Sequence, residues 1–202
     1  MSARSEVKLA GFIKHLESRE NESVIKAMAF MAYNPSIGRV LAKNGVKSFA
    51  KMATSRVAVL SHITSAEDFD SFHHSWVTEI ITKIHRNARG GSKKISYGQA
   101  QKPINVFLKL YVDWAHQPDE KTARRLLPWL HVPLDSIVMK NLSKKFSKEF
   151  NRDIHPLQGK SYSLSKIDRE LYYCWQNLFR TKYSIKPLLF DIVWSTRRGH
   201  AK

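Results

Sequence analysis

Hydrophobic residues recur along most of this chain at the spacing of an α-helix. Near the start, Val7, Leu9, Phe12, Ile13 and Leu16 form one such set. Residues 24–33 are mainly apolar and end at Asn34-Pro35, and residues 37–43 run into Asn44-Gly45. Because asparagine and glycine are favoured just beyond a helix, Asn44-Gly45 is expected to mark a helix C-terminus.

The middle of the chain predicts a long helix followed by a loop. Ser65 and Asp68 have the spacing of a capping box, and Phe69, Phe72, Trp76, Ile80 and Ile84 then recur at helical spacing. We expect this helix to end at Arg89-Gly90-Gly91. Residues 92–101 are basic and rich in turn-forming residues, with a short β-like stretch at residues 94–97.

Further helices are predicted in the second half. Pro103 suits the first turn of a helix, where its missing N–H matters little. Asp135 can cap the next helix, and Ser165 with Asp168 repeats the capping-box spacing before residues 171–179. The last helix is expected at residues 184–194. The pattern as a whole predicts an all-α protein, an irregular helical bundle forming one domain over residues 1–202, with lobes at residues 1–91 and 92–202.

Charge narrows the class of partner. The chain has 202 residues, with 34 Lys and Arg against 17 Asp and Glu, a formal net charge of +17. Between Ile80 and Val112 it has seven basic residues and no acidic one, and a second cluster follows Asp135. Such a basic excess indicates a polyanion, and therefore nucleic acid, as the partner.

Other features exclude several classes of protein. Cys174 is the single cysteine, which rules out an internal disulfide and a cysteine-ligated zinc or iron–sulfur site. There is no run of eighteen apolar residues, so no membrane span is expected, and the N-terminal residues match neither a secretory nor a transit signal. We expect a cytoplasmic, nucleoid-associated protein without metal or cofactor.

Two short motifs each precede a predicted helix. The first is Gly98-Gln99-Ala100-Gln101-Lys102-Pro103, and the second is Val132-Pro133-Leu134-Asp135. This arrangement resembles the helix-hairpin-helix DNA glycosylases, and most nearly the 8-oxoguanine glycosylases, including the compact archaeal ones. In that family a glycine-containing hairpin ends in a lysine, and a Val/Ile-Pro-x-Asp element supplies an aspartate. The resemblance covers residues 97–139 and the closing segment 188–194.

The resemblance implies an active cleft between two helical lobes, with Lys102 as nucleophile and Asp135 as its carboxylate partner. The expected partner is double-stranded DNA with a damaged or modified base, bound by a monomer. The candidate DNA contacts are Arg89, Lys93, Lys94, Gly98, Gln99, Gln101, Lys140 and Lys144. The candidates to line a base pocket are Tyr97, Trp114, Trp129, His131 and Trp175.

The chemistry requires a neutral amine at Lys102 that attacks C1′ of the deoxyribose. A helix N-terminus, the neighbouring Lys93 and Lys94 and partial burial would all disfavour the ammonium form. An aspartate opposite can stabilise an oxocarbenium-like sugar, and the resulting Schiff base permits strand cleavage by β-elimination. The base must first leave the helical stack and enter a pocket. Oxidised guanine is the family's usual substrate, and a bulky modified base of phage DNA, in a defence role, is a second option.

Each candidate also has a simpler explanation. In so basic a chain a lysine is commonly a phosphate contact, Asp135 is a good helix cap without any catalytic role, and the tryptophans suit a core. Asp191 is the reserve candidate for the carboxylate. The alternative function is a non-enzymatic helical module that binds DNA or RNA, and a third option is a helical protein that binds an acidic protein.

Overall fold

The computed structural model describes residues 3–38, 40–42, 45–84 and 95–193, with side chains from residue 12 onward except Ser18. These residues form helices joined by short loops, with no strand among them. The α-helices are α1 (Ala3–Ile37), α2 (Gly45–Val57), α3 (Ala66–Lys83), α4 (Tyr97–Leu108), α5 (Glu120–Leu126), α6 (Ser136–Lys145), α7 (Ser147–Glu149), α8 (His155–Gln158) and α9 (Arg169–Lys182). Shorter 3₁₀ or π turns are η1 (Leu60–His62), η2 (Lys109–Trp114), η3 (Phe150–Ile154), η4 (Leu164–Lys166) and η5 (Pro187–Ile192). The all-α prediction is confirmed for this part of the chain.

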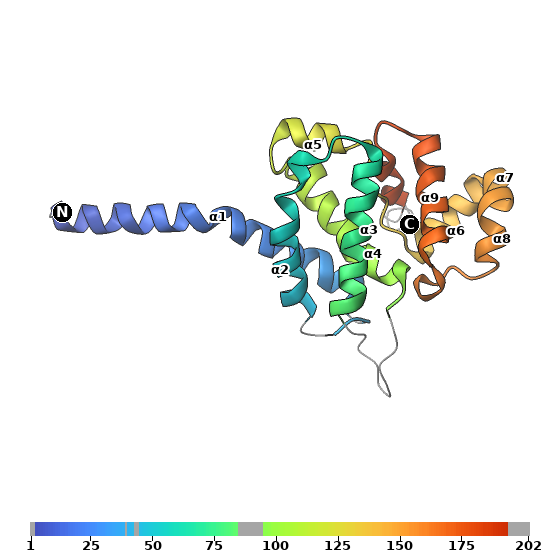
Figure 1. Cartoon of the computed structure of the whole chain (residues 1–202), viewed down its shortest axis with the longest axis horizontal. Helices are drawn as coiled ribbons and strands as arrows, with labels where there is room; N and C mark the ends of the chain where they lie inside the picture. Colours follow the sequence, from blue (N-terminus) through green and yellow to red (C-terminus); the bar gives the residue numbers. More distant parts are fainter. Residues whose placement is uncertain (1–2, 39, 43–44, 85–94, 194–202) are drawn as a thin grey trace, which may run out of the picture.

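Helix α1 is longer than predicted, and its first half projects from the body of the molecule (Figure 1). Pro35 lies in its last turn, and the helix ends two residues later. The prediction that Asn44-Gly45 ends a helix is wrong, because Gly45 begins α2. A Cβ atom on Gly45 would lie 1.9 Å from the hydroxyl of Tyr33, so glycine is required there by close packing of α2 against α1.

The beginning of α3 follows the prediction, whereas the segment after it does not. The Ser65 side chain accepts a hydrogen bond from the Asp68 N–H, which confirms the cap. The helix ends at Lys83, earlier than the expected Arg89-Gly90-Gly91, which lies outside the described residues. The prediction of a β-like stretch at residues 94–97 is also wrong for its described residues, 95–97. Tyr97 starts α4, and Ser96 with Gln99 forms a complete capping box there.

In the C-terminal half the predicted cap of α6 is confirmed, whereas the predicted capping box before α9 is wrong in its first residue. Asp135 accepts hydrogen bonds from the N–H groups of Ile137 and Val138 and so caps α6. Asp168, and not Ser165, caps α9 by accepting from the Leu171 N–H. The expected last helix is instead the 3₁₀ turn η5, and Trp194 is outside the described residues.

Buried side chains from both halves of the chain form one hydrophobic cluster. At its centre the rings of Phe49 (α2), Trp76 (α3) and Phe107 (α4) pack with centroids 5.7–6.1 Å apart. Helix α4 contacts α1, α3 and α9, so it is the central element around which the others pack (Figure 1). Within the described residues no helix combines the length and apolarity needed to cross a membrane.

Candidate active site

Lys102 and Asp135 are brought together by two different elements. Lys102 is on α4, Asp135 is the residue before α6, and the Lys102 Nζ lies 3.5 Å from Asp135 Oδ2. The other carboxylate oxygen, Oδ1, accepts the two α6 N–H groups, so the carboxylate is oriented by the helix it caps. The side chains are 18% and 22% exposed, which leaves both partly accessible to a ligand.

The pair lies between two cavities, and both residues line each of them. One cavity, of about 470 Å³, is also lined by Gln99, Ser136, Tyr162, Ser163 and Ser165. The other, of about 250 Å³, is also lined by Val106, Leu110, Trp114 and Pro133. The first is rich in hydroxyl groups and the second is mainly apolar. The volume of the first falls within the range of small-molecule sites.

A second ion pair borders the smaller cavity. Lys109 Nζ lies 2.6 Å from Asp191 Oδ2, and the side chains are 11% and 8% exposed. Burial raises the pKa of the Asp191 carboxyl, and the charge of Asp135 adds to this rise, whereas the bond from Lys109 opposes it. Lys109 also lies over the ring of Trp114, 5.0 Å from its centroid. Asp191, the reserve carboxylate, is therefore paired with Lys109 rather than with Lys102.

The prediction that residues 98–102 form a hairpin is wrong, because they lie inside α4. Because α4 already begins at Tyr97, Lys102 and Pro103 lie in its second turn and not at its N-terminus. Gly98 is buried against Ile167, and its N–H donates to the Ile167 carbonyl, so this N–H is not available to a phosphate. The proposal that the helix N-terminus disfavours the ammonium of Lys102 consequently loses its geometric basis.

The two glutamines of the motif serve the protein itself. Gln99 is buried, and its side-chain oxygen accepts from the Ser96 N–H, although the side chain also lines the larger cavity. Gln101 is fully buried, and its amide donates to the carbonyls of Gly98 and Leu134. In this conformation Gln101 is thus a structural residue and not a DNA contact.

Of the five residues expected to line a base pocket, Trp114 is at the site. It is 62% exposed and borders the smaller cavity. Trp175 is fully buried and donates to Gln158, and Trp129 packs against the hydrophobic cluster. Tyr97 and His131 are also buried: the Tyr97 hydroxyl lies 3.3 Å from His74 Nδ1, and His131 belongs to a polar network that links α3, α4 and α9. None of these four side chains lines either cavity beside Lys102, so the predicted pocket is not where they lie.

In that network the hydroxyl of Tyr172 connects two buried histidines. It accepts from the Asn105 amide and lies 2.8 Å from His131 Nδ1. His73 Nε2 lies 2.8 Å from Asn105 Oδ1, and His131 Nε2 lies 2.8 Å from Asp70 Oδ1. Burial lowers the pKa of His131 to about 4, although the bond to Asp70 opposes this, and burial also holds the pKa of His73 well below its ordinary value.

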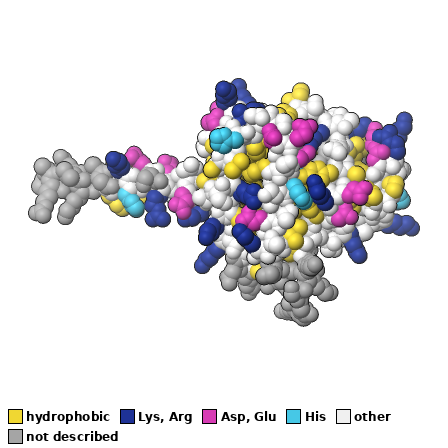
Figure 2. Space-filling model, in the orientation of Figure 1, with side chains coloured by type: hydrophobic (Ala, Val, Ile, Leu, Met, Phe, Trp, Pro, Cys, Tyr) yellow, Lys and Arg dark blue, Asp and Glu magenta, His cyan; other side chains and the backbone are white. Residues whose placement is uncertain are grey.

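The candidate phosphate contacts fall into two groups. Lys140 and Lys144 are exposed on α6, the helix that Asp135 caps. Arg89, Lys93 and Lys94 lie outside the described residues. On the face shown in Figure 2, Lys and Arg side chains are distributed around the body with fewer acidic side chains between them.

Three residues of the larger cavity were not predicted as site residues: Tyr162, Ser163 and Ser165, the last predicted only as part of a capping box. They belong to the loop and turn that lead into α9, where no pattern marks a binding site. The one signal in the sequence is that four of the five residues from Ser161 to Ser165 carry a hydroxyl group. Among the described residues no group of three or more His, Cys, Asp or Glu side chains is arranged to hold a metal ion.

Comparison with known proteins assigns no family. No family model, curated protein or solved structure matches this chain. The functional interpretation consequently depends on the geometry of Lys102, Asp135 and the cavities around them.

Proposed function

We propose that this protein is a DNA glycosylase with lyase activity, folded as a bundle of the helix-hairpin-helix glycosylase type, that excises a damaged or modified base through a Schiff base on Lys102. The observation that carries the proposal is the proximity of Lys102 Nζ and Asp135 Oδ2, 3.5 Å apart and partly exposed beside a cavity of about 470 Å³. The resemblance points to the same lysine and the same carboxylate, which are 33 residues apart in the sequence.

Asp135 has a separate task for each of its oxygens in this mechanism. Oδ1 is occupied by the α6 N–H groups, which fixes the position of the carboxylate. Oδ2 faces Lys102 and can take the proton that the ammonium must lose. The neutral amine attacks C1′ and the bond from C1′ to the base nitrogen breaks. The departing base leaves with the electron pair of that bond and takes up the proton, so atoms and charges balance.

The sugar then opens to a Schiff base between C1′ and Lys102, and removal of a proton from C2′ allows the 3′ phosphate to leave. As the C1′–N bond breaks, the proton held by Asp135 passes to the departing base. The carboxylate charge that this restores stabilises the positive charge that develops on the sugar. The larger cavity is the best candidate for the flipped base. The Tyr162 ring offers a stacking surface, and the hydroxyls of Ser163 and Ser165 offer hydrogen bonds to base edges.

Trapping with borohydride tests the proposal, because reduction of the Schiff base leaves protein and DNA covalently joined. Duplexes with oxidised guanine, with bulky modified cytosines of the phage type and with an abasic site are each incubated with the protein and borohydride. We expect an adduct with the natural protein and with Lys121→Ala, an exposed lysine on α5, and none with Lys102→Ala. The absence of an adduct on every duplex, or an equal adduct with Lys102→Ala, would refute the mechanism.

A non-enzymatic nucleic-acid-binding module is the second candidate, and the net charge of +17 favours it. It predicts that Lys102→Ala only weakens binding slightly, as the loss of any one phosphate contact does. Duplex binding without adduct or base release would support this candidate.

A further inference from the structure

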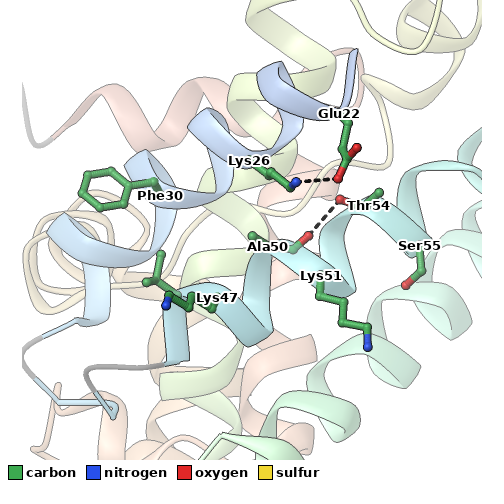
Figure 3. Close-up of a pocket in the computed structure, with 9 residues that line it drawn as sticks. Glu22, Lys26, Phe30, Lys47, Ala50, Lys51, Thr54 and Ser55 are labelled. Atoms are coloured by element: carbon green, nitrogen blue, oxygen red, sulfur yellow. Dashed lines mark hydrogen bonds and ion pairs between the residues drawn. The ribbon is translucent and has the colours of Figure 1, made fainter. Parts of the chain in front are cut away.

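A groove lies between α1 and α2 (Figure 3). None of the residues that line it lines either cavity beside Lys102. The groove has a volume of about 710 Å³ and is lined by Glu22, Lys26 and Phe30 from α1 and by Val46, Lys47, Ala50, Lys51, Thr54 and Ser55 from α2. Phe30 is 57% exposed on its wall. An exposed apolar groove with a charged rim is typical of a surface that receives another chain.

The projecting half of α1 carries an apolar face that nothing in the described chain covers. Phe12 and Leu16 are 58% and 51% exposed, and Ile13, which lies on the same face, is also exposed. A helix that packs against no other element is marginally stable in water. Covering this stripe, formed by Phe12, Ile13 and Leu16, would therefore stabilise the arm.

The arm cannot reach the groove of its own chain while α1 is intact. Both belong to one continuous helix, with the stripe near Phe12 and the groove near Phe30. At 1.5 Å per residue, Leu16 and Glu22 are about 9 Å apart and Phe12 and Phe30 about 27 Å apart along one rigid rod, which cannot fold back on itself. The groove must therefore receive another molecule if it is to receive this stripe.

Two acidic side chains of the arm and two lysines of the groove rim have opposite charges, although Arg19, seven residues after Phe12, lies on the same side of the arm. Glu17 and Glu20 follow the stripe at helical spacing on the same side, whereas Lys47 and Lys51 lie along the groove. Within the described residues none of these four side chains forms an ion pair, and all four are exposed. The acidic side chains of one copy can thus meet unpaired lysines of another.

We propose that the groove between α1 and α2 binds the α1 arm of a second copy of this chain. With two-fold symmetry each copy gives its arm and receives its partner's, so that both stripes are covered and the assembly closes as a dimer. The α1 helices then run antiparallel, with Phe12 of each copy near the partner's groove. This inference replaces the expected monomer and does not depend on the proposed chemistry.

Sedimentation velocity at micromolar protein in physiological salt tests the dimer. We expect twice the chain mass for the natural protein and for the control Ile185→Asp, an exposed apolar residue far along the sequence. Leu16→Asp in the arm and Phe30→Asp in the groove should both sediment as monomers that keep the thermal unfolding transition of the helical body, with a loss of helical circular dichroism no larger than the arm can account for. Both positions are more than half exposed, so the folded chain tolerates the charge.

A mixture of the two variants distinguishes arm-to-groove docking from contact between two arms. In the mixture the intact arm of Phe30→Asp can enter the intact groove of Leu16→Asp, so a species of dimer mass should return. Contact between two arms would give no such recovery. A monomeric natural protein, a dimer that persists in either variant, or a mixture that stays monomeric would overturn the proposal.

Discussion

The two oxygens of Asp135 lead to a prediction that separates folding from chemistry. Asp135→Ala removes the acceptor of two α6 N–H groups and the partner of Lys102. Loss of an N-cap costs about 1 kcal/mol. The ion pair, with side chains 18% and 22% exposed, adds at most about 1 kcal/mol. We therefore expect Asp135→Ala to lower the free energy of unfolding by roughly 1–2 kcal/mol.

Asp135→Asn should lower the free energy of unfolding by less, because asparagine caps helices about as well as aspartate and only the charge is lost. The two variants should differ by about 1 kcal/mol in urea unfolding followed by circular dichroism at pH 7.5, and by roughly 2–4 °C in melting temperature. Asp168→Ala, which removes the equivalent cap from α9, provides the control, since it should cost a similar amount and leave borohydride trapping unchanged.

Equal destabilisation by Asp135→Asn and Asp135→Ala would show that the cap does not account for the contribution of this residue to stability. If the reasoning holds, Asp135→Asn keeps the start of α6 and lacks the carboxylate charge. It is then the appropriate variant for testing the role of that charge in the proposed base excision.

Three further predictions concern acid stability, packing and binding. Burial lowers the pKa of His131 to about 4, so the unfolded state binds more protons than the folded state as the pH falls below 6.5. Urea unfolding should therefore show a free energy of unfolding that is constant above pH 6.5 and decreases by up to about 3 kcal/mol toward pH 4. A flat profile would contradict this. Gly98→Ala would bring a Cβ within 2.6 Å of Ile167 Cβ and of the Leu164 carbonyl oxygen. Thermal unfolding should therefore show that the free energy of unfolding falls by roughly 1–3 kcal/mol. An unchanged melting temperature would mean that α4 is not packed as described. If α6 contacts phosphates, Lys140→Ala and Lys144→Ala should each reduce the slope of log affinity against log salt concentration by about one. Fluorescence anisotropy with a DNA duplex measures this slope. Unchanged slopes would exclude α6 from the interface.

Local signals in the sequence were sufficient for the helical class and for several helix starts. Ser65 and Asp135 cap helices as predicted, because a short polar side chain before an apolar periodic segment satisfies N–H groups within three residues. The pairing of Lys102 with Asp135 was also anticipated, through the resemblance. These predictions succeeded because each depends on residues close in sequence or on a recurrent motif.

Predictions that depend on distant contacts failed. Gly45 and Gly98 were interpreted as turn residues, but each is where another segment packs closely, Tyr33 in one case and Ile167 in the other. His131 and Trp175 were assigned to a pocket because aromatic residues suit both a pocket and a core, and only the packing of α9 distinguishes the two. The hydroxyl-rich wall of the larger cavity is formed by a loop, which has no periodicity to detect.

The network centred on the Tyr172 hydroxyl has a practical consequence for dissecting the molecule. It joins Asn105 from α4 to His131, and through Asn105 it reaches His73 of α3. A fragment of residues 1–91 would leave His73 without this partner and would expose the ring of Trp76 that packs on Phe107. Expression of either half alone should consequently yield aggregated material, and recovery of activity from two co-expressed halves would require that they assemble while they fold.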